Sequence, residues 1–349
     1  MQGESAAAKR GAELRKPPPA YPLLYVSVFG IMATIHYKFF PKESVNMERR
    51  TFLCAAASSA LAACSSSLFA QDRTRPRLQQ AAERQQERVE RRQERRGTRS
   101  PERIPIGVQL YSVRNAVTRD LAGSLEAIAK MGYDGVEFYG GNYFGKDIKD
   151  LRKMLDDNGL KCCGTHTGIA QFRGDQFERT AEIHQILGGK FMIVPGGIDA
   201  YLHDVGRSKE LAEEFNRIAE KAKPLGLYLG YHAHGGDAKL IEGIPAWERF
   251  FDVANQDIVH QMDIGNYKDG GGDPYAMIEK FAGQSKSLHL KEAGQNRPII
   301  GEGTVDWPRV FDLSESIGGV EWYVVEDEVG PDNLDRIEKC IIALRAMGK

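Results

Sequence analysis

The sequence predicts an eight-stranded parallel α/β barrel, and three observations support this fold class. From Ile104 onward, short runs rich in β-branched and aromatic residues alternate with segments whose apolar residues recur at three- and four-residue spacing. The helical segments repeatedly end in glycine just before the next strand, as at Gly132, Gly159 and Gly226, because glycine tolerates the left-handed turn that closes a helix. Eight such units match the roughly 250 residues that are typical of a (β/α)8 barrel.

The eight strands follow one another with a helical pattern after each. They are expected at 106–113, 135–140, 161–168, 190–196, 227–234, 259–266, 287–292 and 322–328. Segments such as "RDLAGSLEAIAKMG" and "SKELAEEFNRIAEKAKPLG" fit the connecting helices. An open doubly wound sheet would normally show a glycine-rich nucleotide turn after its first strand, and "LYSVRNA" is not one. The sequence therefore favours the closed barrel.

The residues before the barrel predict export. "MERRTFLCAAASSALAAC" begins at Met47 and places paired arginines before small and apolar residues, which predicts a twin-arginine export signal at 47–70. Its end, "LAAC", resembles a lipobox in which Cys64 would be lipidated, and ordinary cleavage after Ala70 is the alternative. Residues 1–46 are then an upstream extension or a misassigned start. The expected location is bacterial and exported: periplasmic, or tethered to the membrane as a lipoprotein.

The amino-acid composition limits the kinds of fold and binding partner that are expected. Residues 71–103 are mostly Arg, Gln and Glu with almost nothing to bury, so we expect a disordered linker before the barrel domain at 104–349. The formal net charge of −1 and the pI near 6.7 argue against a nucleic-acid-binding surface. Five cysteines in 349 residues are too few for a disulfide scaffold.

Polar side chains gather at the ends of the last four strands. Asp237 follows the fifth strand, Asp263 lies on the sixth, His289 on the seventh and Glu326 on the eighth. The carboxyl ends of the strands carry the active site in such barrels, and three carboxylates packed together repel unless a cation neutralises them. Oxygen and nitrogen ligands without cysteine suit one divalent ion, Mn²⁺, Mg²⁺, Co²⁺ or Zn²⁺. The alternative is that each residue is an ordinary surface charge.

The motifs "VQLYSVR", "YHAHGGD", "MDIGN", "HLKE", "GEGTVDW" and "EWYVVEDE" occur in this order. Together they resemble the xylose isomerase-like TIM barrel superfamily of sugar phosphate isomerases and epimerases. The resemblance implies a divalent-metal-dependent isomerase or epimerase that acts on a sugar or keto-sugar through an enediolate. In that family Glu, Asp, His and Glu from strands five to eight hold one cation. Asp263, His289 and Glu326 fall on the last three positions, and Asp237 falls on the first, where relatives usually have glutamate.

The resemblance also implies catalytic roles. In the epimerases two metal-bound carboxylates act as base and acid on opposite faces of the sugar, so Glu326 and Asp237 are the predicted catalytic residues. Aspartate is one methylene shorter than glutamate. This departure favours a one-base isomerisation or a metal-dependent lyase, a dehydratase of 3-keto-sugars. A non-catalytic exported sugar-binding lipoprotein is the alternative outside enzymes, and the near-neutral charge disfavours an apurinic endonuclease relative.

Other polar residues at the strand ends are candidates to bind a small carbohydrate substrate. Asn266 stands where the epimerases place a substrate-contacting histidine, Lys291 shares strand parity with His289, and Arg297 resembles an anion- or hydroxyl-binding arginine. A structural hydrogen bond is an equal alternative for His232, His234 and Glu137, whereas His166 is expected in the pocket. The sequence leaves a homo-oligomer open. The predicted substrate-binding residues are Glu137, His166, His232, His234, Asn266, Lys291 and Arg297.

Overall fold

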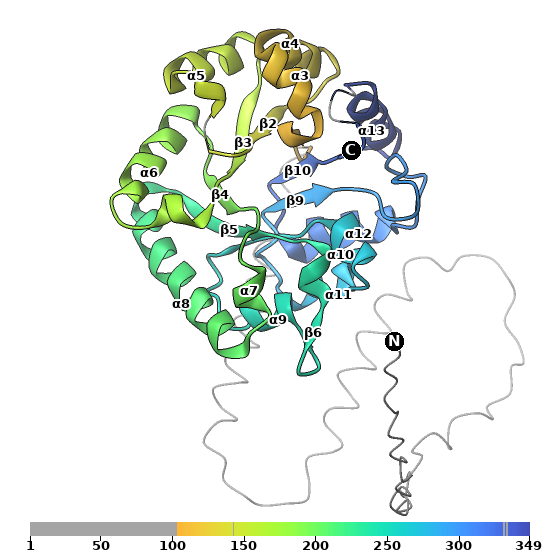
Figure 1. Cartoon of the computed structure of the whole chain (residues 1–349). Coiled ribbons are helices and arrows are strands. Elements are labelled where there is room, and N and C mark those ends of the chain that lie inside the picture. The colour runs from red at the N-terminus through yellow and green to blue at the C-terminus, as the bar shows by residue number, and fades with distance from the viewer. Residues whose placement is uncertain (1–102, 142, 331, 333) are drawn as a thin grey trace, which may run out of the picture. The chain divides into compact units, whose positions relative to one another are not determined.

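The computed structural model describes residues 103–141, 143–330, 332 and 334–349. Eight parallel strands form a nearly closed barrel with helices around it (Figure 1). The strands are β1 (Ile106–Gln109), β2 (Gly135–Phe138), β3 (Lys161–His166), β4 (Phe191–Val194), β5 (Tyr228–His232), β8 (Val259–Gln261), β9 (Ser287–Leu290) and β10 (Trp322–Val325). Their order is β8-β5-β4-β3-β2-β1-β10-β9. A parallel bridge between Asp263 and His289 joins the two edges, so the predicted barrel is confirmed.

Several predictions concern residues outside the described part of the chain. The upstream segment 1–46, the export signal at 47–70 with Cys64, and the linker up to residue 102 all lie there. Export, lipidation and the linker therefore stay predictions. Within the described residues, no helix combines the length and the apolar character that a membrane span requires.

Several of the helices begin at aspartate caps. Asp120, Asp147, Asp204 and Asp306 each accept a hydrogen bond from a backbone N–H in the first turn of the following helix, which satisfies a donor that the helix itself leaves unpaired. The helices are α3 (Arg114–Arg119), α4 (Leu121–Lys130), α5 (Ile148–Asp157), α6 (Gln176–Leu187), α7 (Asp199–Leu202), α8 (Val205–Ala222), α9 (Ala246–Phe251), α10 (Ile264–Asp269), α11 (Pro274–Lys280), α12 (Trp307–Leu313) and α13 (Leu334–Ala346).

Alternation along each strand divides its side chains between helices and barrel interior. On β5, Tyr231 packs against Trp247 and Phe250 of α9, so its neighbours Gly230 and His232 face inward. A Cβ on Gly230 would lie 2.5 Å from a side-chain carbon of Ile193 and 2.8 Å from Val259. Glycine here therefore leaves room for the apolar floor of the barrel, beneath the polar side chains at the mouth.

The predicted strands are too long at their carboxyl ends. The strand expected at 259–266 ends at Gln261, and α10 begins at Ile264. The strand expected at 106–113 ends at Gln109, whose side chain accepts a hydrogen bond from Tyr111 N and so starts a 3₁₀ turn. Polar side chains at these ends bind local backbone groups, and this competes with continued strand pairing. The result is that the mouth is built of tight turns.

A hairpin of two short antiparallel strands, β6 (Leu240–Ile241) and β7 (Ile244–Pro245), lies between β5 and α9 and projects from the barrel (Figure 1).

Candidate metal centre and active site

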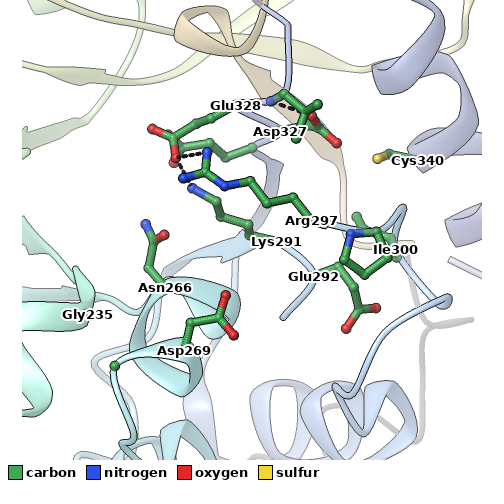
Figure 2. A pocket seen from close by; sticks show the side chains of 14 residues that line it. Gly235, Asn266, Asp269, Lys291, Glu292, Arg297, Ile300, Asp327, Glu328 and Cys340 are labelled. Atoms are coloured by element: carbon green, nitrogen blue, oxygen red, sulfur yellow. Dashed lines mark hydrogen bonds and ion pairs between the residues drawn. The ribbon is translucent and has the colours of Figure 1, made fainter. Parts of the chain in front are cut away.

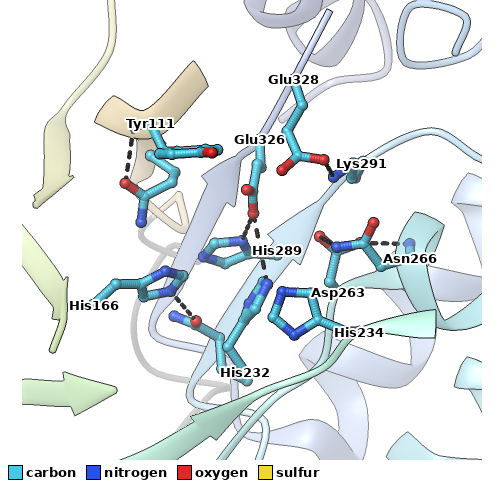
Figure 3. Close-up of polar contacts among 12 residues, drawn as sticks. Tyr111, His166, His232, His234, Asp263, Asn266, His289, Lys291, Glu326 and Glu328 are labelled. Atoms are coloured by element: carbon cyan, nitrogen blue, oxygen red, sulfur yellow. Dashed lines mark hydrogen bonds and ion pairs between the residues drawn. The ribbon is translucent and has the colours of Figure 1, made fainter. Parts of the chain in front are cut away.

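Four side chains at the carboxyl ends of neighbouring strands can together hold a metal ion. His232 ends β5, Asp263 follows β8, His289 lies on β9 and Glu326 follows β10 (Figure 3). Each offers one ligand atom, and these atoms all lie within 4.8 Å of one another. None of the four residues is more than 6% exposed. We call these four residues the ligand group.

Asp263 is positioned by the helix that follows it. Its Oδ1 accepts a hydrogen bond from Asn266 N at 2.8 Å, and its Oδ2 accepts one from Asn266 Nδ2 at 2.9 Å. The carboxylate thus caps α10 while facing the ligand group. Asn266, predicted to contact substrate, fixes Asp263 and also lines the cavity beside it.

Asp237, the predicted fifth-strand ligand, lies outside the ligand group. Its oxygens accept hydrogen bonds from Tyr231 Oη at 3.0 and 3.1 Å and from His234 N at 2.7 Å. The chain turns immediately after β5, and this turn carries Asp237 to the face of the strand that Tyr231 occupies. The structure brings His232 to the ligand group in its place, because His232 has the inward parity. Burial raises the pKa of Asp237 to about 7.

His289 lies between two carboxylates. Its Nδ1 is 2.7 Å from Glu326 Oε2, and its Nε2 is 2.7 Å from Glu137 Oε2. Burial opposes a charged imidazole here, but Glu137 and Glu326 together raise the pKa of His289 to about 10. A hydrogen bond from Nε2–H to Glu137 orients the ring and directs Nδ1 to the ligand group, as a carboxylate commonly does for a metal-binding histidine.

Glu137 lies beneath the ligand group and is fully buried, so the structure places it away from the cavity surface where a substrate contact was predicted. Gln109 Nε2 donates to its Oε2 and Gln261 Nε2 to its Oε1, each at 2.8 Å. Burial disfavours its charge, but His166 and His289 hold the pKa of Glu137 well below its usual value. A Cβ on Gly164 would lie 2.6 Å from Glu137 Oε1, so glycine at that position leaves room for the carboxylate.

The remaining predicted histidines surround this centre. His166 Nε2 lies 2.7 Å from Gln261 Oε1 and 3.0 Å from Glu137 Oε2, and its ring stacks on that of His289 with centroids 5.2 Å apart. His234 packs its ring edge-to-face with His232 at 4.8 Å, at the outer side of the group (Figure 3). His166 is thus held by hydrogen bonds to the side chains beneath the ligand group and does not line the cavity where it was predicted.

The electrostatics of the ligand group favour a cation. Burial, assisted by the neighbouring Glu326, raises the pKa of Asp263 to about 7, so the two carboxylates resist being charged together. Burial opposes the charge of Glu326 as well, but the hydrogen bond from His289 and the charge of Lys291 keep its pKa low. Burial and the neighbouring histidines hold the pKa of His232 well below its usual value. A neutral imidazole can act as a ligand, and His232 Nδ1 is buried without a hydrogen-bond partner among the described residues.

A cavity of about 280 Å³ opens beside the ligand group. It is lined by Glu326, and by Asn266, Lys291 and Arg297 from the predicted substrate-binding set (Figure 2). It is small beside the roughly 300–1,000 Å³ of typical ligand pockets, which suits a single small polyol. The cavity is therefore the place where we expect the substrate.

Lys291 and its sequence neighbour have different partners. Lys291 Nζ donates a hydrogen bond to Glu328 across the cavity, and burial of the lysine is outweighed by Asp263, Glu326 and Glu328, which raise its pKa. Glu292 points the other way. It accepts hydrogen bonds from Trp307 Nε1 and from three backbone N–H groups, those of Ala293, Gly301 and Val305. Lys291 and Glu292 are thus not paired with each other.

Three residues that sequence reasoning missed belong to this site: Gln109, Gln261 and Glu328. The two glutamines share strand parity with the inward-facing positions of β1 and β8, which is the signal that could have found them. Glu328 lies in "EDE" after β10, two residues beyond Glu326. Nothing in that run distinguishes it from a surface charge until Lys291 is placed beside it.

Known proteins resemble this chain over the barrel. A family model described as "Xylose isomerase-like TIM barrel" matches residues 125–347. The chain is 22% identical over 249 residues to inosose dehydratase of Geobacillus kaustophilus, which covers 59% of this chain and 80% of that protein. It is 25% identical over 226 residues to 3-dehydroshikimate dehydratase of Pseudomonas aeruginosa, 60% of this chain but only 34% of that protein. A solved sugar phosphate isomerase/epimerase from Parabacteroides distasonis is 26% identical, with a TM-score of 0.62, over 71% of this chain and 96% of that one.

Proposed function

Because this chain belongs to the xylose isomerase-like TIM barrel family, we propose that it is a divalent-metal-dependent lyase. Its reaction is the removal of water from a hydroxylated ketone of the sugar type, through an enolate. The observation that carries the choice of a lyase is the position of Asp237, which is hydrogen-bonded to Tyr231 and His234 away from the ligand group. In the two-faced epimerisation that the family resemblance implies, carboxylates from the fifth and eighth strands act on opposite faces of the sugar. Here His232 takes the fifth-strand position, so Glu326 has no carboxylate partner from that strand.

The ligand group fits a divalent cation. It combines two imidazoles with two carboxylates, and His232 Nε2 lies 3.7 Å from Glu326 Oε2. A neutral imidazole so placed can share a cation with that carboxylate. Imidazole ligands suit Zn²⁺, Mn²⁺ or Co²⁺ better than Mg²⁺. Such a cation supplies Lewis acidity that polarises a carbonyl and stabilises an enolate.

The protein's own residues supply the remaining chemistry. Glu326 belongs to the ligand group and also lines the cavity, and it is ionised because its pKa is held low, so it is the base that removes the proton next to the carbonyl. The protonated Glu326 then returns this proton to the departing hydroxyl, whose C–O bond breaks as the enolate forms the double bond, so that water leaves. Lys291 keeps its proton, because the surrounding carboxylates raise its pKa, and it therefore donates hydrogen bonds to substrate oxygens rather than accepting a proton. Asn266 can donate to a substrate hydroxyl but cannot relay protons.

An isomerase or epimerase is the second candidate. The similarity to the Parabacteroides distasonis sugar phosphate isomerase/epimerase favours it, whereas the names of the two curated relatives denote removal of water. Both reactions begin with the same proton transfer to Glu326.

One experiment separates these candidates. Ketoses and cyclic keto-polyols are incubated with the protein in heavy water, with and without chelator, and analysed by NMR and mass spectrometry. We expect a metal-dependent product that is one water lighter than its substrate, and no reaction with Glu326→Gln. Deuterium in a recovered isomer without loss of water would establish the isomerase instead. Stoichiometric metal with neither reaction would leave a binding protein and reject the enzyme.

A further inference from the structure

The cavity beside the ligand group is rich in acidic side chains. Its described lining contains five acidic residues and two basic ones. A phosphate or carboxylate on a substrate would need a cation that is not already neutralised, because bringing an anion among buried carboxylates is costly. The acidic residues are Asp269, Glu292, Glu326, Asp327 and Glu328, and the basic ones are Lys291 and Arg297.

Both basic residues of this lining face one acid, Glu328. Lys291 Nζ donates a hydrogen bond to Glu328 Oε2, and Arg297 Nη1 lies 3.7 Å from the same oxygen. Figure 2 shows the two cationic ends gathered at this carboxylate over the cavity. The lysine side chain is only 10% exposed, so this pair is shielded from solvent, whereas the arginine is 62% exposed and its contact is weaker.

The other acids of the lining have donors elsewhere. Glu292 accepts three backbone hydrogen bonds and one from Trp307. Asp327 is bound by Arg336 through Nε and Nη2. These carboxylates are committed to the loops around the cavity. Among the acids of the lining, Glu328 is therefore the one in direct contact with both Lys291 and Arg297, and its charge adds to those of Asp263 and Glu326 near the lysine.

The loop that carries Arg297 is fixed in place. Arg336 Nη2 donates a hydrogen bond to the Arg297 carbonyl oxygen at 2.8 Å. Asn296 and Arg297 have φ angles of 65° and 46°, a left-handed conformation that is uncommon outside glycine and that surrounding contacts must maintain. The arginine is thus held at the cavity rim, within reach of Glu328.

We propose that Glu328 is a specificity-determining residue that neutralises Lys291 and Arg297 and thereby restricts the cavity to uncharged polyols, excluding phosphorylated and carboxylated ones. The inference rests on the proposed function, since it takes this cavity to be the substrate site. Specificity of this kind comes from an element that disfavours the wrong ligand, and here that element is a carboxylate placed where an anionic group would otherwise bind two cations.

The test is a calorimetric titration of the full chain with inorganic phosphate, in the presence and absence of Mn²⁺. Glu328→Gln keeps the shape of the side chain and releases Lys291 and Arg297, so it should bind phosphate at least ten-fold more tightly than the wild type. Glu338→Gln on α13 is the matched control, because it makes the same charge change on an exposed residue; it should bind phosphate as the wild type does. Adding Lys291→Met to Glu328→Gln should abolish the gain.

Equal phosphate affinity of the wild type and Glu328→Gln would overturn the proposal, as would a wild type that binds phosphate more tightly than the variant. The titration needs no turnover, so its result is separate from that of the reaction test. Water loss from a keto-polyol together with an unchanged phosphate affinity would reject the role of Glu328 and leave the proposed function standing. A ten-fold gain in phosphate affinity without any reaction would support the role of Glu328 and reject the proposed function.

Discussion

At the scale of single residues, the first prediction concerns which residue at the end of β5, His232 or Asp237, binds the metal. His232 ends β5 with its ring at the ligand group, whereas Asp237 is bound by Tyr231 and His234. We expect His232→Ala to lower the affinity for Mn²⁺ or Zn²⁺ by at least about 100-fold, the upper end of what even an indirect partner of a metal ligand contributes. Asp237→Asn should change it by less than about three-fold, since Asn can still accept from His234 N and pair with Tyr231.

Metal titration of the two purified variants, with circular dichroism as a check of folding, measures this difference. Loss of metal in Asp237→Asn together with retention in His232→Ala would restore the assignment that the sequence alone suggested.

The sequence located three of the four ligand-group residues because Asp263, His289 and Glu326 lie at strand ends with inward parity. It misplaced the fourth because the direction of a tight turn depends on contacts that periodicity does not contain. Asp237 follows the strand by five residues, and the hydrogen bond from Tyr231 that holds it on the outer face depends on the path of the turn between them. The hydrogen bond between His289 and Glu137, which are 152 residues apart in the sequence, could not be predicted from neighbouring residues either.

At the scale of elements, the loop between β9 and α12 is organised by one buried carboxylate. Glu292 is 6% exposed and accepts hydrogen bonds from Ala293 N, Gly301 N, Val305 N and Trp307 Nε1. In Glu292→Gln an NH2 group replaces one carboxylate oxygen. The N–H groups that donated to this oxygen then face another donor and lose their acceptor, which costs about 2 kcal/mol. We expect Glu292→Gln to lower the unfolding free energy by that amount and to speed amide hydrogen exchange in 293–305.

Glu302→Gln is the control for this prediction, because Glu302 lies in the same loop but is exposed and accepts one hydrogen bond, from Ile299 N at 3.3 Å. It should leave both quantities nearly unchanged. If hydrogen exchange in the loop were the same in both variants, the carboxylate would not be what organises it.

The sequence predicted the presence of the helices and strands more accurately than the residues at which they end. Apolar periodicity identified the eight strands and their helices, since burial on one face is a local property of sequence. The ends differed because Gln109 and Asp263 bind nearby backbone N–H groups and convert expected strand into turn or helix. Asp263 belongs to the ligand group and Gln109 supports it through Glu137. The secondary structure predicted from the sequence was therefore least accurate next to the candidate site.

At the scale of the whole molecule, two buried histidines that pack the barrel against its helices contribute to the pH dependence of stability. His184 Nδ1 donates to Gly189 O, and its Nε2 accepts from Thr165 Oγ1 at 2.8 Å. His260 Nε2 accepts from Trp247 Nε1 at 2.5 Å. Burial lowers the pKa of His184 to about 4 and that of His260 to about 3, so both must stay neutral in the folded protein.

In the unfolded chain these histidines bind protons near pH 6.5. The stability they contribute is therefore present above that pH and is lost as the pH falls toward their folded values. At about 1.4 kcal/mol per pH unit, each removes about 2 kcal/mol between pH 6.5 and pH 5. Asp237 acts in the opposite direction, because its folded pKa is raised to about 7 and its protonation in that range favours the folded state. The total drop combines these opposing contributions, so a variant must isolate one of them.

His184→Asn isolates one histidine, since its amide can still donate to Gly189 O but does not take up a proton. The unfolding free energy from urea titration should fall between pH 7 and pH 5 by about 2 kcal/mol less in His184→Asn than in the wild type, whatever the variant costs at pH 7. Comparing the two changes with pH removes that constant cost and the contribution of Asp237, which is common to both proteins. An equal fall in wild type and variant would mean that His184 is protonated equally in folded and unfolded chains, against the burial that the structure gives it.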